Sequence, residues 1–158
     1  MLRGRPANEA GPKPSRGATF LTVDLQQARE FIRDHHRAVL ATRDPGGGIQ
    51  QSPVLVNVDA EGRAIISSRE TAYKVRNLRR DPWAQACVFT NSFFGQWLFL
   101  EGQAGVLSLP EAMDPLIDYY QRFPDENPDW DDYRARMERE QRVLIRIELA
   151  RAGPDRAG

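Results

Sequence analysis

The chain has 158 residues, a length typical of one domain that buries its own core. Its 22 basic and 22 acidic residues cancel at neutral pH, so the whole molecule has no net field to attract nucleic acid or an acidic membrane. No apolar run approaches the roughly twenty residues of a membrane helix, and the first residues lack the apolar core of a signal peptide. The sequence therefore predicts a soluble, cytoplasmic protein that binds neither nucleic acid nor membrane.

The single cysteine, Cys87, excludes an internal disulfide and disfavours a cysteine-ligated metal site. Because it lies in the apolar run 84–89, we expect a small buried strand residue. The sequence contains no His-x-x-x-His pair, so no metal site is predicted.

Residues 1–20 are rich in proline and glycine and poor in apolar side chains, so we expect a disordered N-terminal tail. One folded domain is expected over 21–150, followed by a flexible C-terminal tail at 151–158. Within the domain, Asp24 is a plausible N-cap for an amphipathic helix that ends near His36. Strands are predicted at 38–42, 49–58 and 63–67, and Pro53 indicates that the second of them is an edge strand or contains a bulge.

After a helix at 68–80, strands are predicted at 83–90 and 97–109, helices at 110–122 and 129–140, and a closing strand at 143–149. Gly102 and Gly105 lie inside the long strand, where glycine usually means a bend, a bulge or close approach of another group. Six short strands at hairpin-like spacing predict a mainly β fold of the α+β type, an antiparallel barrel with helices at its ends. The alternating order of a parallel doubly wound sheet is absent.

The stretch 67–82 concentrates helix signals and positive charge. Ser67 and Glu70 have the spacing of a capping box, and Pro82 stops the helix. Lys74, the only lysine inside the expected domain, lies beside Leu78 on the apolar side of this helix and can reach inward. A helix N-terminus with serine hydroxyls and an ammonium nearby predicts a phosphate site.

Two other interpretations of this charge remain open. A charge run on a helix is often only a solvated face, and a basic patch can also bind nucleic acid. Phe93, Phe94 and Trp97 could stack bases, but the acidic segment 125–132 and the neutral total argue against that, and we expect these aromatics in the core or a pocket wall. No catalytic motif occurs, so in an enzyme a bound cofactor would carry the chemistry.

The run KVRNLRRDP at 74–82, with AVLAT at 38–42 and SPV at 52–54, resembles the pyridoxamine 5′-phosphate oxidase-like flavin and deazaflavin oxidoreductases. The similarity is greatest to the branch that uses coenzyme F420, and it covers roughly residues 25 to 149. This resemblance implies a split β-barrel of the FMN-binding type that forms a homodimer, with two cofactor sites at the subunit interface.

The resemblance also implies site residues. Lys74 would contact the cofactor phosphate, with Ser67 and Ser68 at a strand end that faces it. The segment 51–54 would run alongside the ring of the cofactor, and residues near Trp97 would line the same cleft. The full implied cofactor-binding set is Gln51, Ser52, Pro53, Val54, Ser67, Ser68, Lys74, Asn77, Gln96 and Trp97. No residue is assigned as catalytic.

The function implied is hydride transfer from reduced F420 to a small organic substrate. An FMN-dependent oxidoreductase of the same fold is one alternative, since both cofactors carry a ribityl phosphate. A cofactor-binding carrier without turnover is the other, since no catalytic group is evident. The polyglutamate tail of F420 favours the deazaflavin, because Arg69, Arg76, Arg79 and Arg80 could pair with its carboxylates; these arginines could also pair across the dimer or face water.

Overall fold

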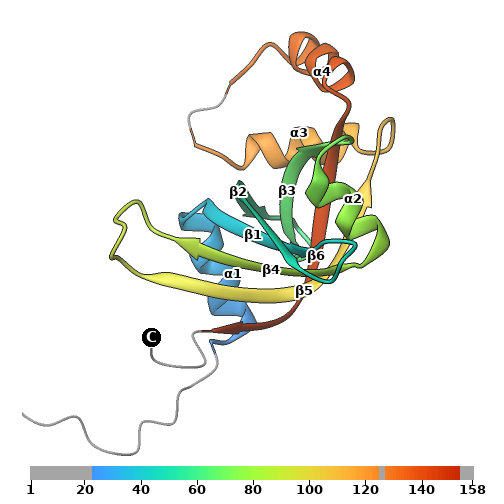
Figure 1. The fold of residues 1–158 in the computed structure, drawn as a ribbon. Helices are drawn as coiled ribbons and strands as arrows, with labels where there is room; N and C mark the ends of the chain where they lie inside the picture. Colours follow the sequence, from blue (N-terminus) through green and yellow to red (C-terminus); the bar gives the residue numbers. More distant parts are fainter. Residues whose placement is uncertain (1–22, 125–126, 154–158) are drawn as a thin grey trace, which may run out of the picture.

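The computed structural model describes residues 23–124 and 127–153 (Figure 1). The predicted N-terminal tail and residues 154–158 lie outside these ranges. The strands are β1 (Arg37–Arg43), β2 (Ile49–Val58), β3 (Ala64–Arg69), β4 (Trp83–Phe89), β5 (Trp97–Leu107) and β6 (Arg142–Gly153). The helices are α1 (Leu25–Asp34), α2 (Tyr73–Arg80), α3 (Met113–Gln121) and α4 (Trp130–Arg139).

The strands form a closed barrel in the order β1-β2-β3-β6-β5-β4, with every neighbouring pair antiparallel (Figure 1). This confirms the predicted fold class. Alternate side chains point into the barrel, because successive residues of a strand face opposite sides. Leu40, Ala86 and Leu100, for example, are at most 3% exposed in the main core.

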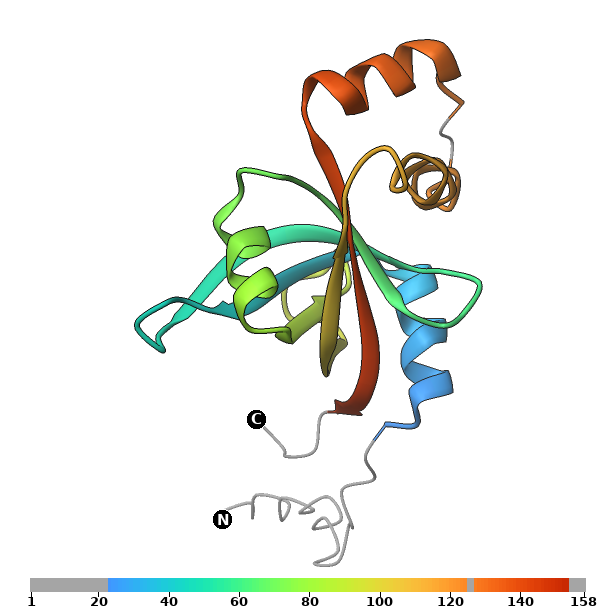
Figure 2. The same ribbon diagram turned by 90° about the vertical axis from the view of Figure 1, so that its right-hand side faces the viewer.

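The helices close the barrel and cover part of its outside (Figures 1 and 2). Asp24 caps α1 through the predicted capping position, and the buried Ala28 and Ile32 of α1 join the main core. α3 and α4 form a second core against the outer face of β3 and β6, which includes Ile65 and Leu144. We call these two helices the α3–α4 lobe. No helix in the described ranges is both long and apolar enough to span a membrane.

The long strand β5 has the irregularity that its glycines predicted. The pairing with β6 shifts register between Glu101 and Gly102. A Cβ on Gly102 would lie well inside van der Waals distance of the Glu148 carbonyl oxygen, whereas a Cβ on Gly105 would meet nothing within 4 Å. The prediction of close approach is therefore confirmed at Gly102. Strand β6 runs on to Gly153, past the predicted end at Leu149, because this second half pairs with the start of β5.

The predicted capping box at the start of α2 is wrong. Ser67 and Ser68 belong to β3, where they pair with β6, and α2 begins only at Tyr73, with Ala72 as an N-cap that makes no side-chain bond. Glu70 instead accepts a hydrogen bond from Ser108 at 2.8 Å and pairs with Arg79. Long-range strand pairing thus overrides a local helix signal.

Several predicted core residues are also on the surface. Cys87 is exposed, because the inward positions of β4 are taken by Ala84, Ala86 and Val88. Phe93 and Phe94 are 86% and 94% exposed between β4 and β5, and Trp97 is 44% exposed. The expectation that these residues fill the core or a pocket wall is therefore wrong for a single chain.

Candidate functional site

The barrel is split between β2 and β3. Residues 49–55 of β2 pair with β1, but only 56–58 pair with β3, whereas β3 pairs with β6 along its whole length. The backbone at 53–55 therefore has no ladder partner on the side that faces β3. Pro53 fits this position because it has no N–H to donate, which confirms the predicted edge.

Tyr119 of α3 is inserted at the point where the β2–β3 ladder stops. The last paired residues there are Val56 and Ile66, so continuing the ladder would pair Leu55 with Ser67. Instead the Tyr119 hydroxyl donates to the Leu55 carbonyl oxygen at 2.9 Å. Burial raises the pKa of this phenol well above its ordinary value, while the backbone of Ser67 acts in the opposite direction. The hydroxyl thus replaces a rung of the ladder and keeps the split open.

A cavity of about 830 Å³ lies at this split. Its barrel side includes five of the ten predicted cofactor-binding residues, namely Pro53, Val54, Ser67, Ser68 and Lys74. Its other side is the α3–α4 lobe, which contributes Tyr119, Tyr120, Tyr133, Arg136 and Met137. The volume lies toward the upper end of the range typical of small-molecule sites.

Lys74 is the second residue of α2 and is half-buried at the cavity wall. Desolvation lowers the pKa of its ammonium from the ordinary value. No described carboxylate lies within ion-pair distance of it. A desolvated, unpaired cation at the first turn of a helix is suited to an anion, since the free N–H groups of that turn add to its charge.

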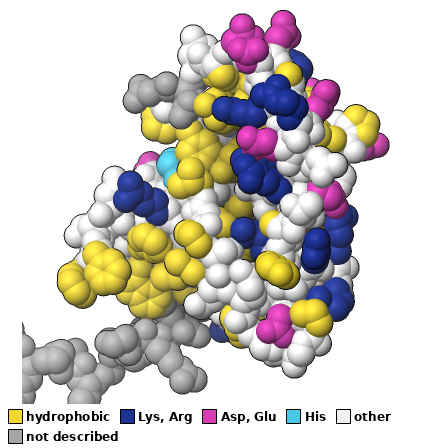
Figure 3. Space-filling view, turned by 45° about the horizontal axis from the view of Figure 1, so that its top comes forward, with side chains coloured by type: hydrophobic (Ala, Val, Ile, Leu, Met, Phe, Trp, Pro, Cys, Tyr) yellow, Lys and Arg dark blue, Asp and Glu magenta, His cyan; other side chains and the backbone are white. Residues whose placement is uncertain are grey.

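Positive charge is concentrated around the cavity, although the chain as a whole is neutral. The cationic side chains among the described lining residues are Arg37, Arg69, Lys74, Arg136 and Arg142, against the single carboxylate of Glu140. Glu140 pairs with Arg142 at 2.6 Å and with Arg69 at 3.5 Å. A hydrogen bond from Arg142 lowers the pKa of this carboxyl group. Figure 3 shows Lys and Arg side chains gathered beside hydrophobic ones on this face.

The other five predicted residues do not line the cavity. Gln51 is exposed on β2, and the neighbouring Ser52 has a buried Oγ with no hydrogen-bond partner among the described residues. Gln96 and Trp97 are exposed at the far end of the β4–β5 hairpin.

Asn77, the fifth, is 3% exposed and binds the protein itself. Its amide donates to Thr42 Oγ1 at 3.1 Å, and its carbonyl oxygen accepts from Arg80 at 3.3 Å. It therefore fixes α2 on β1, and through α2 it sets the position of Lys74.

The four arginines that could bind a glutamate tail differ in their contacts. Arg79 pairs with Glu70, and Arg80 bonds to Asn77 and to the Arg43 carbonyl oxygen. The guanidinium of Arg76 lies 5.9 Å from the ring centroid of Tyr73. Only Arg69 of the four lines the cavity.

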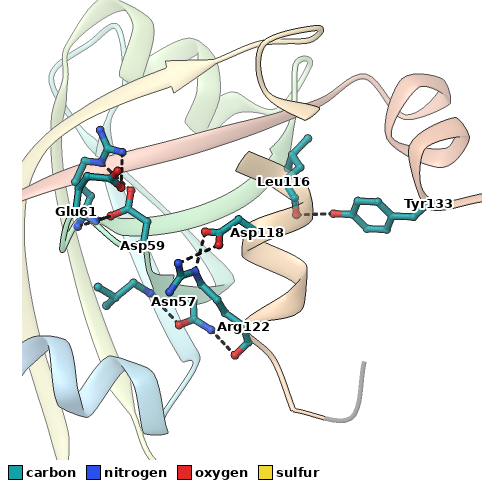
Figure 4. A network of polar contacts seen from close by, with 9 residues as sticks. Asn57, Asp59, Glu61, Leu116, Asp118, Arg122 and Tyr133 are labelled. Atoms are coloured by element: carbon teal, nitrogen blue, oxygen red, sulfur yellow. Dashed lines mark hydrogen bonds and ion pairs between the residues drawn. The ribbon is translucent and has the colours of Figure 1, made fainter. Parts of the chain in front are cut away.

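The contribution of the α3–α4 lobe to the site was not predicted from the sequence. Polar contacts order this lobe, and one of them, from Asn57 of β2, joins it to the barrel (Figure 4). Arg122 pairs with Asp118 at 2.7 Å, its carbonyl oxygen accepts from Asn57 at 3.1 Å, and Tyr133 donates to the Leu116 carbonyl oxygen at 2.9 Å. The only signal in the sequence was the recurrence of aromatic residues in both helices, which is also typical of ordinary helix packing.

A family model described as pyridoxamine 5′-phosphate oxidase matches residues 25–153 of the chain. Among solved structures, a conserved hypothetical protein from Mycobacterium tuberculosis is similar, with a TM-score of 0.68, 20% identity and 88% of each chain covered. An F420 reductase has a TM-score of 0.61 at 16% identity, over 79% of this chain and 94% of that one. A candidate pyridoxamine 5′-phosphate oxidase from Listeria innocua has a TM-score of 0.59 at 15% identity, over 81% and 94%. At these identities the structural likeness shows a shared fold.

Proposed function

The chain belongs to the pyridoxamine 5′-phosphate oxidase family, and on that basis we propose that it is an oxidoreductase that binds coenzyme F420 in the cavity at the split of its barrel. The reduced deazaflavin, when bound, supplies a hydride to a small organic substrate. The observation that carries the proposal is Lys74, a half-buried cation without a carboxylate partner among the described residues, beside two serines at a gap in the barrel.

The residues present fit a phosphate-bearing cofactor. Lys74 offers an ammonium, Ser67 and Ser68 offer hydroxyls, and the first turn of α2 offers backbone N–H groups. The unpaired edge of β2 at 53–55 leaves backbone groups free to bind the edge of a heterocycle. The buried hydroxyl of Ser52, which has no hydrogen-bond partner among the described residues, lies on the same strand and could donate to a ligand.

The chain's own contribution to the reaction is binding, orientation and exclusion of water. Hydride transfer requires close stacking of donor and acceptor and a dry site more than it requires an acid and base pair. Tyr119 and Met137 are at most 7% exposed and give the cavity a largely apolar back wall. The absence of a catalytic motif in the sequence is therefore compatible with turnover.

F420 is favoured over FMN by the charge at the cavity rim. Both cofactors carry one phosphate, and Lys74 could bind either phosphate equally well. F420 adds the carboxylates of a glutamate tail. Arg69 and Arg142 line the same cavity, and among the described residues both pair with the single carboxylate of Glu140, so they retain capacity for further carboxylates. The fold shared with an F420 reductase adds support.

Titration of the purified protein with F420 and with FMN tests the choice. We expect F420 to bind at least tenfold more tightly, because only its tail engages the rim arginines. Protein that purifies yellow with bound FMN would contradict the deazaflavin assignment and support the FMN-dependent alternative. Mixing the protein loaded with reduced F420 with redox acceptors in a stopped-flow cell distinguishes an enzyme from a carrier, since a carrier leaves the oxidation rate unchanged.

We also propose a homodimer formed by the outer face of the β2-β1-β4-β5 sheet. Val39, Cys87 and Phe99 are cross-strand neighbours on this face and are half-buried or exposed. Leu55 and Trp97, 51% and 44% exposed, extend it. An apolar sheet face of this kind is typical of a surface that pairs with a partner. A second copy would also explain why Gln96 and Trp97 lie away from the cavity of their own chain: they would complete that of the partner.

Cys87→Asp is expected to convert the dimer to a monomer, because it places a charge at the centre of this apolar face. Light scattering after size exclusion measures the mass directly. Ala135→Asp, an equal change on the exposed side of α4, is the matched control and should leave the dimer intact. A monomeric wild-type protein, or a Cys87→Asp variant that remains dimeric, would contradict this interface.

A further inference from the structure

The α3–α4 side of the cavity is an aromatic wall. The rings of Tyr120 and Tyr133 lie with centroids 4.8 Å apart. Trp130 does not line the cavity, but its ring packs against that of Tyr133 at 5.5 Å. Met137, 4% exposed, belongs to the same core cluster and also lines the cavity. Side chains of this kind offer flat, polarisable surface to another planar ring. Nothing in the phosphate site at Lys74 requires such a wall.

Arg136 adds a positive charge to this wall. Its guanidinium lies 5.5 Å from the ring centroid of Tyr133. Glu140, four residues further along, forms its ion pairs with Arg142 and Arg69. No described carboxylate is within ion-pair distance of Arg136. The charge of Arg136 is therefore available to an anion that enters the cavity.

The two cationic positions belong to different parts of the fold. Lys74 lies on α2, which follows β3, while Arg136 lies on α4, a separate helix of the lobe (Figure 1). Both residues line the cavity. A phosphate held at Lys74 does not use Arg136, and a volume of about 830 Å³ leaves room for a second small molecule beside part of a cofactor.

We propose that Tyr120, Tyr133, Met137 and Arg136 form the substrate subsite, and that the substrate is a planar aromatic molecule with a carboxylate group. The ring packs on the tyrosines while the guanidinium fork of Arg136 holds the carboxylate by two parallel hydrogen bonds. The identification of this ligand as substrate rests on the proposed function, whereas the binding site itself does not. The carboxylates of a cofactor tail have the same chemistry, so the test must separate the two sources.

The probes are 2-naphthoate, its uncharged isostere 2-naphthamide, and γ-linked triglutamate as a mimic of the cofactor tail. Isothermal titration of the full-length protein measures the binding of each. We expect 2-naphthoate to bind wild type at least tenfold more tightly than 2-naphthamide does. Arg136→Gln should remove that difference. Arg134→Gln, the same loss of charge on the same helix but away from the cavity, should retain it.

The variants also separate this proposal from the proposed function. Lys74→Ala should lose cofactor affinity and keep 2-naphthoate binding, whereas Arg136→Gln should do the reverse. If F420 fails to bind the wild-type protein but the binding of 2-naphthoate still depends on Arg136, the cofactor assignment is wrong and the subsite is supported. If triglutamate binds through Arg136 and 2-naphthoate does not, the charge serves a cofactor tail and the aromatic substrate is overturned. Equal 2-naphthoate affinity in wild type and Arg136→Gln overturns it as well.

Discussion

Replacing Lys74 with alanine is expected to weaken binding of the phosphate-bearing cofactor by about 1.5 to 3 kcal/mol, the usual contribution of a hydrogen bond to a charged group. This corresponds to a loss of affinity of roughly 10- to 150-fold. The effect should be near the upper end, because Lys74 is half-buried and a phosphate left without it would face a partly desolvated wall. Fluorescence titration with F420 measures the loss.

Arg76→Ala is the matched control for this variant. Arg76 lies two residues further along α2, is exposed, and contacts Tyr73 rather than the cavity. Its removal should change cofactor affinity by less than about twofold, since a distant exposed charge is screened by water and salt. Equal losses in the two variants would mean that α2 attracts the cofactor only by its overall charge and that Lys74 has no specific contact.

Replacing Gly102 with alanine is expected to lower the free energy of unfolding by about 3 kcal/mol, toward the upper end of the cost of overpacking a rigid core. The added Cβ would collide with the carbonyl group of Glu148, and a backbone group paired in β6 cannot move aside as a flexible side chain can. Urea denaturation followed by circular dichroism measures the change.

The same strand provides the comparison for this substitution. Gly105→Ala adds an identical methyl group where nothing lies within 4 Å, so the free energy of unfolding should change by less than about 0.5 kcal/mol. If Gly102→Ala unfolds at the same urea concentration as Gly105→Ala, the close approach at the bulge does not exist in solution. If Gly102→Ala fails to fold while Gly105→Ala folds normally, the loss of stability is larger than expected and the close approach at Gly102 is supported.

Much of the fold was predictable from local patterns. All six strands and the four helices were expected near their observed positions, because alternation at period 2 and apolar spacing at period 3.6 are properties of neighbouring residues. Pro53 and Gly102 indicated an edge and a close approach for equally local reasons, namely a missing N–H and a missing Cβ.

The errors arose where distant segments compete for the same residues. The spacing of Ser67 and Glu70 is a sound capping signal, but Ser67 and its neighbour Ser68 pair with β6 and so belong to a strand. Glu70 forms an ion pair with Arg79 instead. Cys87 lies in an apolar run whose alternate members face opposite sides of the sheet, and the sequence does not show which side is covered.

The stretch around Lys74 by itself determined that a lysine beside an apolar helix stripe reaches inward, since helix geometry relates those side chains directly. Only the tertiary structure decided what it faces. The β2–β3 ladder ends early because Tyr119, 64 residues along the chain from Leu55, replaces the next rung. Arg136 lines the same cavity from a still later helix. Such contacts depend on how separate elements pack, which no local period encodes.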